Sequence, residues 1–159
     1  MSRKKTGKQI FLILHNIRSA YNVGSIFRTA DAVGISKIFI GGYTPVPNNP
    51  KVAKTSLGAE KSVEWEKNFN TWKTIEDLKS KGVCVVALEQ SKSSKDYLKF
   101  KPKFPLAVIV GNEVKGLSKD ILNRVDSTWH IPMLGKKESL NVTIATGVFV
   151  YKIREFMDS

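Results

Sequence analysis

Glycine, amide and charged residues follow a buried apolar run in the second half of the chain. The run 106–110 leads into Gly111-Asn112-Glu113-Val114-Lys115-Gly116-Leu117-Ser118. A glycine-rich turn between a strand and a helix is the setting in which backbone N–H groups bind phosphate. Leu117 stands where such a loop needs lysine, however, and Glu113 would place a negative charge in the anion site. The glycines therefore indicate either a ligand close to the backbone or only a tight strand-to-helix turn.

A second group of candidate residues has helical spacing, in the segment Asn22-Val23-Gly24-Ser25-Ile26-Phe27-Arg28. On a helical wheel at about 100° per residue, the apolar residues lie on one side and Gly24 and Arg28 lie together on the solvent side. A phosphate or ribose could approach the helix above Gly24 and meet the planar guanidinium of Arg28. The simpler alternatives are that Arg28 is a surface arginine near Asp31 and that Asn22 is only a helix N-cap.

A third group joins an apolar run to the last helix. It reads Ile131-Pro132-Met133-Leu134-Gly135-Lys136-Lys137-Glu138-Ser139-Leu140-Asn141-Val142. Ser139 and Asn141 offer a hydroxyl and an amide near the N-terminus of that helix, where they could contact a ligand or simply cap the helix.

Apolar runs and amphipathic segments alternate along the chain. We predict strands at 9–15, 37–41, 62–66, 83–88, 106–111 and 128–132. We predict helices at 22–33, 71–81, 118–124 and 140–156, with one or two helical turns at 51–58 and a proline-rich loop at 42–50. In the helix 71–81 the inward residues should be Trp72, Ile75 and Leu78. Apolar strands that alternate with helices predict an α/β fold with a mostly parallel sheet covered on both faces.

Two further expectations follow from these elements. The loops 89–95, 111–117 and 133–139 should meet at the carboxyl edge of the sheet, where open α/β folds bind ligands. The apolar residues of the last helix spread over roughly 200° of its wheel, wider than the roughly 100° that a one-sided surface helix needs. Part of that surface needs a second partner, and self-association is the simplest one.

Composition narrows the class of protein. The chain has 159 residues and a net charge of +12, so it is the size of one domain and should attract polyanions. Nucleic acid is the leading partner, and a basic surface without a partner is the alternative. Cys84 is the only cysteine, and His15 and His130 belong to no metal-binding pattern, so we expect no metal site. We expect no membrane span and no signal peptide, and hence a cytoplasmic protein, since every apolar run is far shorter than about 18 residues.

Taken together and in this order, the three groups resemble the motifs of the SpoU/TrmH family of RNA ribose 2′-O-methyltransferases, within the SPOUT superfamily. The first motif is matched by Asn22, Gly24, Ile26 and Arg28. The second is matched by 110–113 and 116–118, and the third by 131–133, Gly135 and 139–142. The segment 54–59 is similar to one that is common in the family. The resemblance covers nearly the whole chain.

The resemblance implies a SPOUT-type α/β fold with a C-terminal trefoil knot, S-adenosylmethionine as cofactor, and a homodimer formed through the C-terminal helix. It implies one methyltransferase domain at 9–159 after a basic arm at 1–8, which contains Arg3, Lys4, Lys5 and Lys8. The cofactor-binding residues it implies are Leu88, Gly111, Ile131, Met133, Ser139 and Leu140. The catalytic residues it implies are Arg28, Asn22, Glu113, Ser139 and Asn141.

These implications predict methyl transfer to a ribose 2′-hydroxyl in tRNA or rRNA. A guanidinium is a poor base, so Arg28 is expected to hold a phosphate and stabilise the developing 2′-alkoxide, while water or a substrate phosphate accepts the proton. One alternative is a base methyltransferase of the same superfamily, and another is an RNA-binding module without catalysis. A nucleotide- or NAD-binding protein is disfavoured, because neither phosphate-binding fingerprint is complete.

Overall fold

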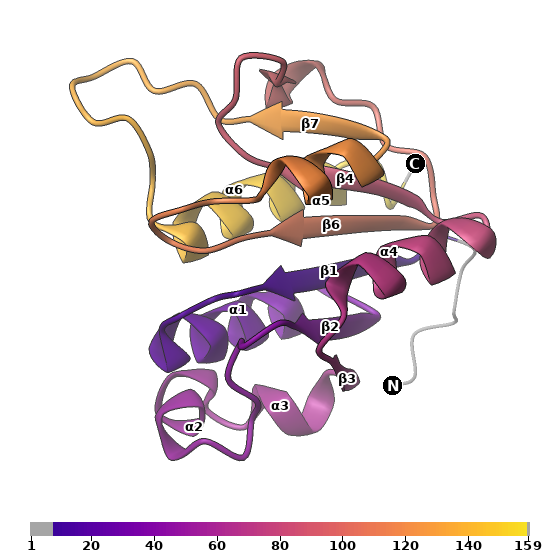
Figure 1. Ribbon diagram of the computed structural model, residues 1–159. Helices are drawn as coiled ribbons and strands as arrows, with labels where there is room; N and C mark the ends of the chain where they lie inside the picture. Colours follow the sequence, from indigo (N-terminus) through magenta and orange to yellow (C-terminus); the bar gives the residue numbers. More distant parts are fainter. Residues whose placement is uncertain (1–7, 159) are drawn as a thin grey trace.

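Within residues 8–158, which the computed structural model describes, seven strands form one sheet in the order β3-β2-β1-β6-β4-β7-β5 (Figure 1). All of the paired neighbours run parallel. The strands are β1 (Ile10–His15), β2 (Lys37–Gly41), β3 (Trp65–Asn68), β4 (Cys84–Leu88), β5 (Lys95–Asp96), β6 (Leu106–Val110) and β7 (Ser127–His130). The predicted α/β class with a parallel sheet is confirmed, and the trefoil knot stays a prediction.

Helices cover both faces of this sheet (Figure 1). The helices are α1 (Ala20–Val33), α2 (Pro50–Ser56), α3 (Ala59–Ser62), α4 (Thr71–Ser80), α5 (Lys119–Arg124) and α6 (Val142–Arg154), with a 3-10 turn η1 (Tyr97–Lys99). Helices α1 and α6 pack against one face of the sheet, and α4 and α5 pack against the other. None of the helices within the described part of the chain is both long and apolar enough to cross a membrane.

The core lies on both faces because the strands are apolar at successive positions. In β1, Leu12 and Leu14 face α1 and α6, whereas Ile13 faces α4 and α5. Phe27 of α1 and Phe149 of α6 are fully buried against the first face. Each such side chain contributes about 1.5–3 kcal/mol to stability relative to an exposed one. These two layers hold the strand ends in place, and the strand ends carry the candidate site.

The N-terminal arm is only partly within the described residues. Arg3, Lys4 and Lys5 of the predicted arm lie outside them. The side chain of Lys8 donates a hydrogen bond of 3.0 Å to the backbone carbonyl of Phe156, just after α6. The described end of the arm is therefore tied to the C-terminal helix.

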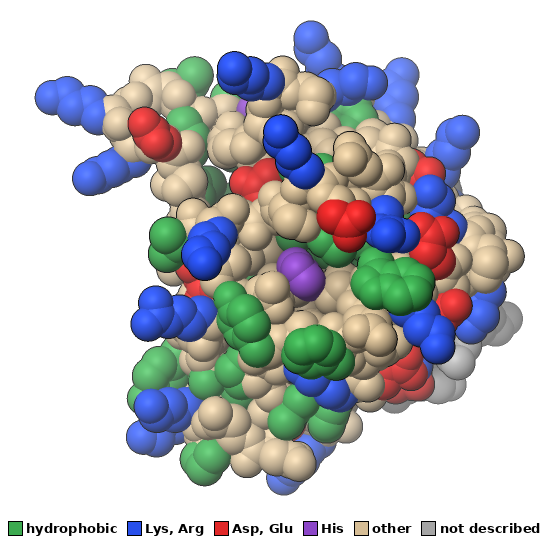
Figure 2. Space-filling model, viewed as in Figure 1, with side chains coloured by type: hydrophobic (Ala, Val, Ile, Leu, Met, Phe, Trp, Pro, Cys, Tyr) green, Lys and Arg blue, Asp and Glu red, His purple; other side chains and the backbone are tan. Residues whose placement is uncertain are grey.

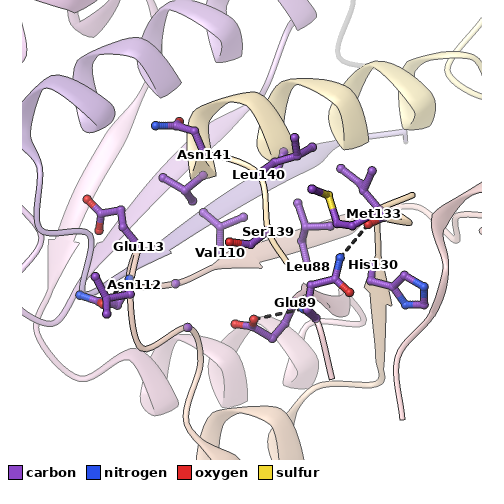
Figure 3. A pocket seen from close by; sticks show the side chains of 17 residues that line it. Leu88, Glu89, Val110, Asn112, Glu113, His130, Met133, Ser139, Leu140 and Asn141 are labelled. Carbon is purple, nitrogen blue, oxygen red and sulfur yellow. Dashed lines mark hydrogen bonds between the residues drawn. The ribbon is translucent and has the colours of Figure 1, made fainter. Parts of the chain in front are cut away.

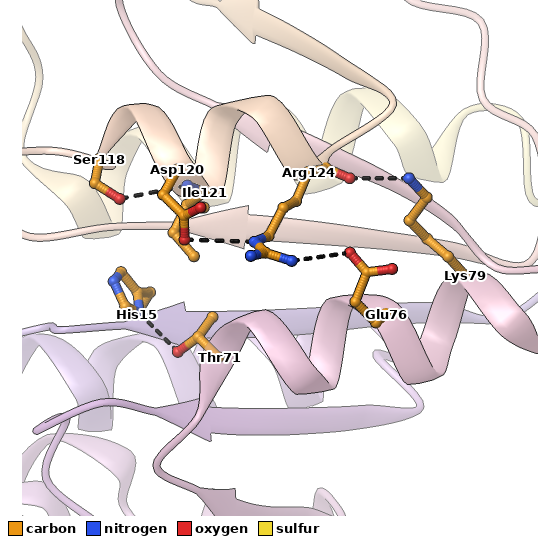
Figure 4. A network of polar contacts seen from close by, with 8 residues as sticks. All are labelled: His15, Thr71, Glu76, Lys79, Ser118, Asp120, Ile121 and Arg124. Carbon is orange, nitrogen blue, oxygen red and sulfur yellow. Dashed lines mark hydrogen bonds and ion pairs between the residues drawn. The ribbon is translucent and has the colours of Figure 1, made fainter.

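A polar network links α4 to α5 on the face opposite α1 and α6 (Figure 4). The guanidinium of Arg124 contacts Asp120 at 3.4 Å and Glu76 at 3.2 Å, and Lys79 donates a hydrogen bond to the backbone carbonyl of Arg124. Ser118 caps α5 as predicted, accepting a hydrogen bond from the backbone of Ile121. Glu76, Lys79 and Arg124 lie in the C-terminal halves of α4 and α5, whereas Ser118 at the start of α5 belongs to the second motif.

The prediction that Trp72 faces inward is wrong. Trp72 is 46% exposed, and its ring lies 5.4 Å from the guanidinium of Arg124. Thr71 and Thr74 are buried in its place. The hydroxyl of Thr71 forms a hydrogen bond of 2.6 Å with Nδ1 of His15, so this polar side chain can be buried at the start of α4 (Figure 4). The buried face of the helix is therefore rotated relative to its apolar stripe.

The predicted role of Asn22 as N-cap is also wrong. Helix α1 begins at Ala20, and Ser19 is its N-cap, accepting a hydrogen bond of 3.2 Å from the backbone of Asn22. Ala20 and Tyr21 extend the helix by two residues ahead of the apolar stripe. Ser19, rather than Asn22, therefore occupies the N-cap position. The amide of Asn22 is thereby left available for a contact outside the helix.

Gly24 does not lie on the solvent side of α1, as the helical wheel predicted. It is buried where α2 crosses α1. A Cβ atom at Gly24 would lie 2.0 Å from Oγ1 of Thr55 and 2.2 Å from the backbone oxygen of Val52. A wheel describes one helix alone, so it could not show that the segment after β2 folds back over this position.

Replacing Gly24 with alanine is expected to lower the free energy of unfolding by about 1–3 kcal/mol, because α1 and α2 must separate to admit the methyl group. Gly147 in α6 is the matched control, since a Cβ there would meet Thr29 only at 3.9 Å, an ordinary contact. Gly147→Ala should instead raise the free energy of unfolding by roughly 0.5–1 kcal/mol. Urea denaturation of both variants measures this. A Gly24→Ala variant as stable as the wild type would contradict the helix contact.

Several element boundaries also differ from the predictions. Strand β3 covers Trp65–Asn68 rather than 62–66, because the short helix α3, which was not predicted, occupies Ala59–Ser62. Helix α6 begins at Val142 rather than at residue 140, with Asn141 as its N-cap. The strand β5 and the 3-10 turn η1 were not predicted. The other predicted strands and helices lie within about two residues of their observed positions, a usual uncertainty for element ends.

Candidate functional site

A cavity of about 370 Å³ lies at the carboxyl ends of β4, β6 and β7 and at the start of α6 (Figure 3). The three loops that were expected to meet at this edge all contribute to its wall. The cavity is lined by all of the predicted cofactor-binding residues, namely Leu88, Gly111, Ile131, Met133, Ser139 and Leu140. Three of the predicted catalytic residues, Glu113, Ser139 and Asn141, line it as well.

The end of β4 supplies a carboxylate and an amide to the cavity. The carboxylate of Glu89 accepts hydrogen bonds from the backbone of Leu117 at 2.7 Å and of Gln90 at 3.1 Å. The side-chain amide of Gln90 donates a hydrogen bond of 2.7 Å to the backbone carbonyl of Ile131. These contacts hold the loops after β4, β6 and β7 together. Burial raises the pKa of Glu89, although the two backbone hydrogen bonds oppose this effect.

The glycines of the loop after β6 serve its own packing. A Cβ at Gly111 would lie 2.5 Å from the side chain of Leu117, and one at Gly116 would lie 2.3 Å from the carboxylate of Glu89. Gly116 also has a φ of +65°, which disfavours any other residue. The tight-turn interpretation therefore accounts for both glycines, and a bulky residue at position 111 would disrupt this loop before it reached a ligand.

Glu113 joins this loop to the start of α1. Its carboxylate accepts hydrogen bonds from the backbone N–H groups of Arg18 at 2.8 Å and Ser19 at 2.9 Å, and from the side-chain amide of Asn22 at 3.1 Å. A carboxylate is stabilised there by the unpaired N–H groups and by the positive end of the helix dipole. Glu113 thus supplies the negative charge at the N-terminus of α1. It also connects the first and second motifs, although 91 residues separate Asn22 from Glu113.

The electrostatics of Glu113 follow from these contacts. Burial alone would raise its pKa, but the hydrogen bonds from Arg18, Ser19 and Asn22 outweigh burial and hold the pKa below its usual value. The side chain is therefore ionised at neutral pH and is engaged by three donors. It is better suited to positioning α1 than to accepting a proton.

The third motif reaches the cavity through an extended segment between β7 and α6 that projects from the sheet (Figure 1). Asn141 caps α6, with its side-chain oxygen accepting a hydrogen bond of 2.8 Å from the backbone of Thr143. The predicted capping role is confirmed, and Asn141 and Ser139 also line the cavity. Hydroxyl and amide groups from this segment therefore stand at the cavity wall beside Glu113 (Figure 3).

Two of the predicted catalytic residues, Asn22 and Arg28, are not among the residues that line the cavity. Asn22 contacts the cavity wall through Glu113, and Arg28 lies farther along α1. Arg28 is exposed there. Its helix packs beside α6, where Gly147 faces Thr29.

The outer side of α6 is apolar, since Ile144 is 56% and Tyr151 is 51% exposed and Val148 lies between them. This exposed stripe matches the wide apolar arc predicted for the last helix.

Some residues of the site had not been singled out from the sequence. Glu89, Gln90 and His130 line the cavity, and Nδ1 of His130 forms a hydrogen bond of 2.7 Å with Ser94. The signal for Glu89 was present, because a polar residue directly after an apolar strand lies at the ligand-binding edge of an α/β sheet.

Known proteins match this chain in sequence. Residues 9–151 match the SpoU rRNA Methylase family. The Bacillus subtilis protein YacO, whose name assigns it to the TrmH family of tRNA/rRNA methyltransferases, is 34% identical over 152 residues, which are 96% of this chain and 61% of YacO. The chain therefore spans about three fifths of the length of that relative.

Solved structures match the fold. An A. aeolicus TrmH/SpoU tRNA modifying enzyme is 30% identical, with a TM-score of 0.86 over 97% of this chain and 78% of that one. An AdoMet-bound rRNA methyltransferase from Sinorhizobium meliloti is 28% identical, with a TM-score of 0.85 over 97% of this chain and 59% of that one. The second and third motifs line one cavity, Asn22 of the first motif contacts Glu113 at its wall, and the family match extends over residues 9–151. This chain belongs to the SpoU rRNA Methylase family.

Proposed function

We propose that this protein transfers a methyl group from S-adenosylmethionine to a ribose 2′-oxygen in tRNA or rRNA. The observation that carries the proposal is the contact of Glu113 with Asn22 and the start of α1, beside the cavity that Ser139 and Asn141 line. The names of the relatives support an RNA substrate, and the AdoMet-bound structure supports the cofactor.

The cavity fits this cofactor in size and in chemistry. Its volume of about 370 Å³ lies within the range of small-molecule sites. Leu88, Ile131 and Leu140 offer apolar contacts for an adenine ring, with Gly111, Met133 and Ser139 beside them, and the carboxylate of Glu89 offers a negative charge to a cationic ligand. When bound, S-adenosylmethionine supplies a methyl group on a positively charged sulfur.

The remaining residues orient and polarise the ribose. Ser139 and Asn141 hold the sugar at the cavity, and Glu113 keeps Asn22 and α1 in place. Neither Glu113, with its lowered pKa, nor Arg28, with its permanently charged guanidinium, is a good base at neutral pH. Arg28 therefore binds the neighbouring phosphate and stabilises the developing 2′-alkoxide, and water or a phosphate oxygen takes the proton.

A homodimer through α6 would complete this site. The N-terminal end of α6 lines the cavity, and the exposed stripe of Ile144, Val148 and Tyr151 runs along the same helix. In a two-fold symmetric dimer, a second copy packed on this stripe lies next to the cavity of the first copy. The helix α1 of the second copy packs beside its own α6 and is therefore close to that cavity. Arg28 of the second copy then reaches the cavity of the first.

Replacing Ile144 with glutamate is expected to convert the dimer to a monomer, because an unpaired carboxylate would be buried in an apolar interface. Sedimentation velocity should give twice the chain mass for the wild type at micromolar concentration and a single chain mass for the variant. Leu98→Glu, which alters an exposed leucine on η1 instead, is the control and should remain dimeric. A wild-type protein that is monomeric and fully active would contradict the dimer.

The proposed reaction is tested by the atom that is methylated. The protein is incubated with isotopically labelled S-adenosylmethionine and RNA from cells that lack it, and the modified nucleotide is then mapped. A 2′-O-methyl group removes the nucleophile for alkaline cleavage, so the modified linkage should survive hydrolysis. A substrate with a 2′-deoxy nucleotide at the mapped position should accept no methyl group. Methylation of the deoxy substrate would assign the reaction to a base, and RNA binding without any transfer would indicate a binding module.

A further inference from the structure

A second, wider groove adjoins the cavity on the far side of Glu113. It has a volume of about 750 Å³ and is formed by the start of α1, the loop between β2 and α2, and the loop after β6. The groove and the cavity share Asn112, Glu113 and Val114, so this short segment is the wall between them. None of the three motifs predicted a role for the loop between β2 and α2.

Two tyrosine rings line this groove and remain largely exposed. Tyr21 is 45% and Tyr43 is 55% exposed. The hydroxyl of Tyr43 accepts a hydrogen bond of 2.9 Å from the side-chain amide of Asn112, and its backbone N–H donates one of 3.2 Å to Asn16. The backbone carbonyl of Tyr21 accepts a hydrogen bond of 2.8 Å from Thr55. The ring of Tyr43 is therefore held in place through its hydroxyl, and it offers aromatic surface to a ligand at little entropic cost. Tyr21 is fixed through its backbone in α1, and its exposed ring lines the same groove.

The groove is also cationic. Arg18, Lys51 and Lys115 line it, and within residues 8–158 none of the three forms an ion pair with a carboxylate. Its acidic residue, Glu113, is already neutralised in part by the N–H groups at the start of α1. Lysine and arginine side chains are also spread over the face of the molecule seen in Figure 2. This charge suits phosphate groups, which release counterions when they bind.

We infer that this groove binds the RNA nucleotide that is to be methylated, and that this nucleotide is unpaired in the RNA. The inference rests on the proposed function. Exposed aromatic rings beside cations recognise single-stranded nucleic acid, because a base can stack on a ring only when it has left its own helix. Tyr21 and Tyr43 stack the base, and Arg18, Lys51 and Lys115 bind the adjoining phosphates. The ribose then lies at the wall formed by Asn112 and Glu113, next to the cofactor cavity.

The test uses a fluorescein-labelled oligouridylate, single-stranded or annealed to its complement, and measures binding by fluorescence anisotropy. The wild type should prefer the single strand. Tyr21→Ala and Tyr43→Ala should each weaken single-strand binding by about 5- to 150-fold, the range for loss of one base stack. Tyr43→Phe keeps the ring and loses only the hydrogen bond from Asn112, so it should retain most of the binding that Tyr43→Ala loses. Trp72→Ala removes an equally exposed ring on α4, outside the groove, and is the matched control.

A second readout reports stacking itself. Fluorescence of 2-aminopurine placed in the oligonucleotide should be quenched on binding to the wild type and to Trp72→Ala, and should be much less quenched by Tyr43→Ala. Tyr21→Ala places a strong helix former on the exposed side of α1, so this variant should fold even if the loop variant does not. Thermal unfolding and calorimetry of S-adenosylmethionine binding check that each variant is intact.

The outcomes separate this inference from the proposed function. If the wild type methylates RNA and both tyrosine-to-alanine variants bind and methylate as well as it does, the groove is not the nucleotide site and the inference is overturned. Equal binding of the duplex and the single strand also overturns it. If the variants lose binding and quenching while the wild type transfers no methyl group to any RNA, the groove is supported as an RNA site and the proposed catalysis fails.

Discussion

Replacing Arg28 with alanine is expected to lower turnover by about 10²–10³-fold while leaving S-adenosylmethionine binding unchanged. The physical reason is the loss of a fixed positive charge at the position where the 2′-oxygen becomes negative, an effect of the size seen when one donor of an oxyanion site is removed. Cofactor binding should be unaffected, since Arg28 is proposed to contact the phosphate and the 2′-oxygen of the RNA and not S-adenosylmethionine. Arg28→Lys should recover little activity, because lysine lacks the planar fork that binds phosphate in two places.

The control for Arg28 is another arginine whose loss removes the same charge. Arg124 on α5 contacts Asp120 and Glu76 (Figure 4) and is not among the residues that line the cavity or the groove. Arg124→Ala should therefore keep wild-type turnover in a single-turnover methyl-transfer assay with the mapped RNA. An Arg28→Ala protein with normal turnover would show that Arg28 is only a solvated surface arginine.

The dimeric site makes a further test of Arg28 possible. If Arg28 acts on the cavity of the partner copy, two inactive chains can restore one site. A heterodimer of an Arg28→Ala chain and a Glu113→Gln chain, isolated with two different affinity tags, has one site with both residues intact and one with neither. Its turnover should be about half that of the wild type, because sites in a symmetric dimer are equivalent. A heterodimer as inactive as its parents would mean that Arg28 and Glu113 act within one chain.

Replacing Glu113 with glutamine is expected to lower both stability and turnover. The carboxylate accepts from the backbone of Arg18 and Ser19 and from the amide of Asn22, and an amide cannot accept these bonds through its nitrogen. Hydrogen bonds to a charged group contribute about 1.5–3 kcal/mol to stability. The conformation in which residue 113 contacts the start of α1 should therefore be populated about 10- to 150-fold less in the variant. Urea denaturation and methyl-transfer kinetics measure the two effects.

Glu138→Gln is the matched control for Glu113. Glu138 is an exposed carboxylate in the segment between β7 and α6, and its loss changes the charge by the same amount. This variant should be as stable and as active as the wild type. A Glu113→Gln protein that behaves in the same way would show that the contact with α1 contributes nothing measurable.

The pH dependence of stability gives an independent check on Glu113. Because the native pKa of Glu113 lies below its unfolded value of about 4.3, its contribution to stability is present above that value and is lost as the pH falls through the native pKa. The free energies of unfolding of the wild type and of Glu113→Gln should therefore differ most near pH 7. The difference should shrink in acid, below about pH 4.

The sequence by itself determined the class of fold and the location of the cavity. The apolar strands predicted a parallel sheet because a strand that is apolar at every position must be buried on both faces. The resemblance assigned Leu88, Gly111 and Ile131 to one site, and all three lie at the ends of predicted strands, where the carboxyl ends of parallel strands share an edge. All three line the cavity in the structure.

Only the tertiary structure decided which segments meet across the chain. Periodicity shows which side of an element is buried, but not which element buries it. Thus Gly24 on α1 is covered by α2, and Trp72 on α4 is exposed beside Arg124. The contacts of Glu113 with Asn22 and of Asn112 with Tyr43 depend in the same way on the strand order. The sheet places β6 directly beside β1, so the loop after β6 reaches the start of α1, and no local pattern in the sequence encodes that neighbour.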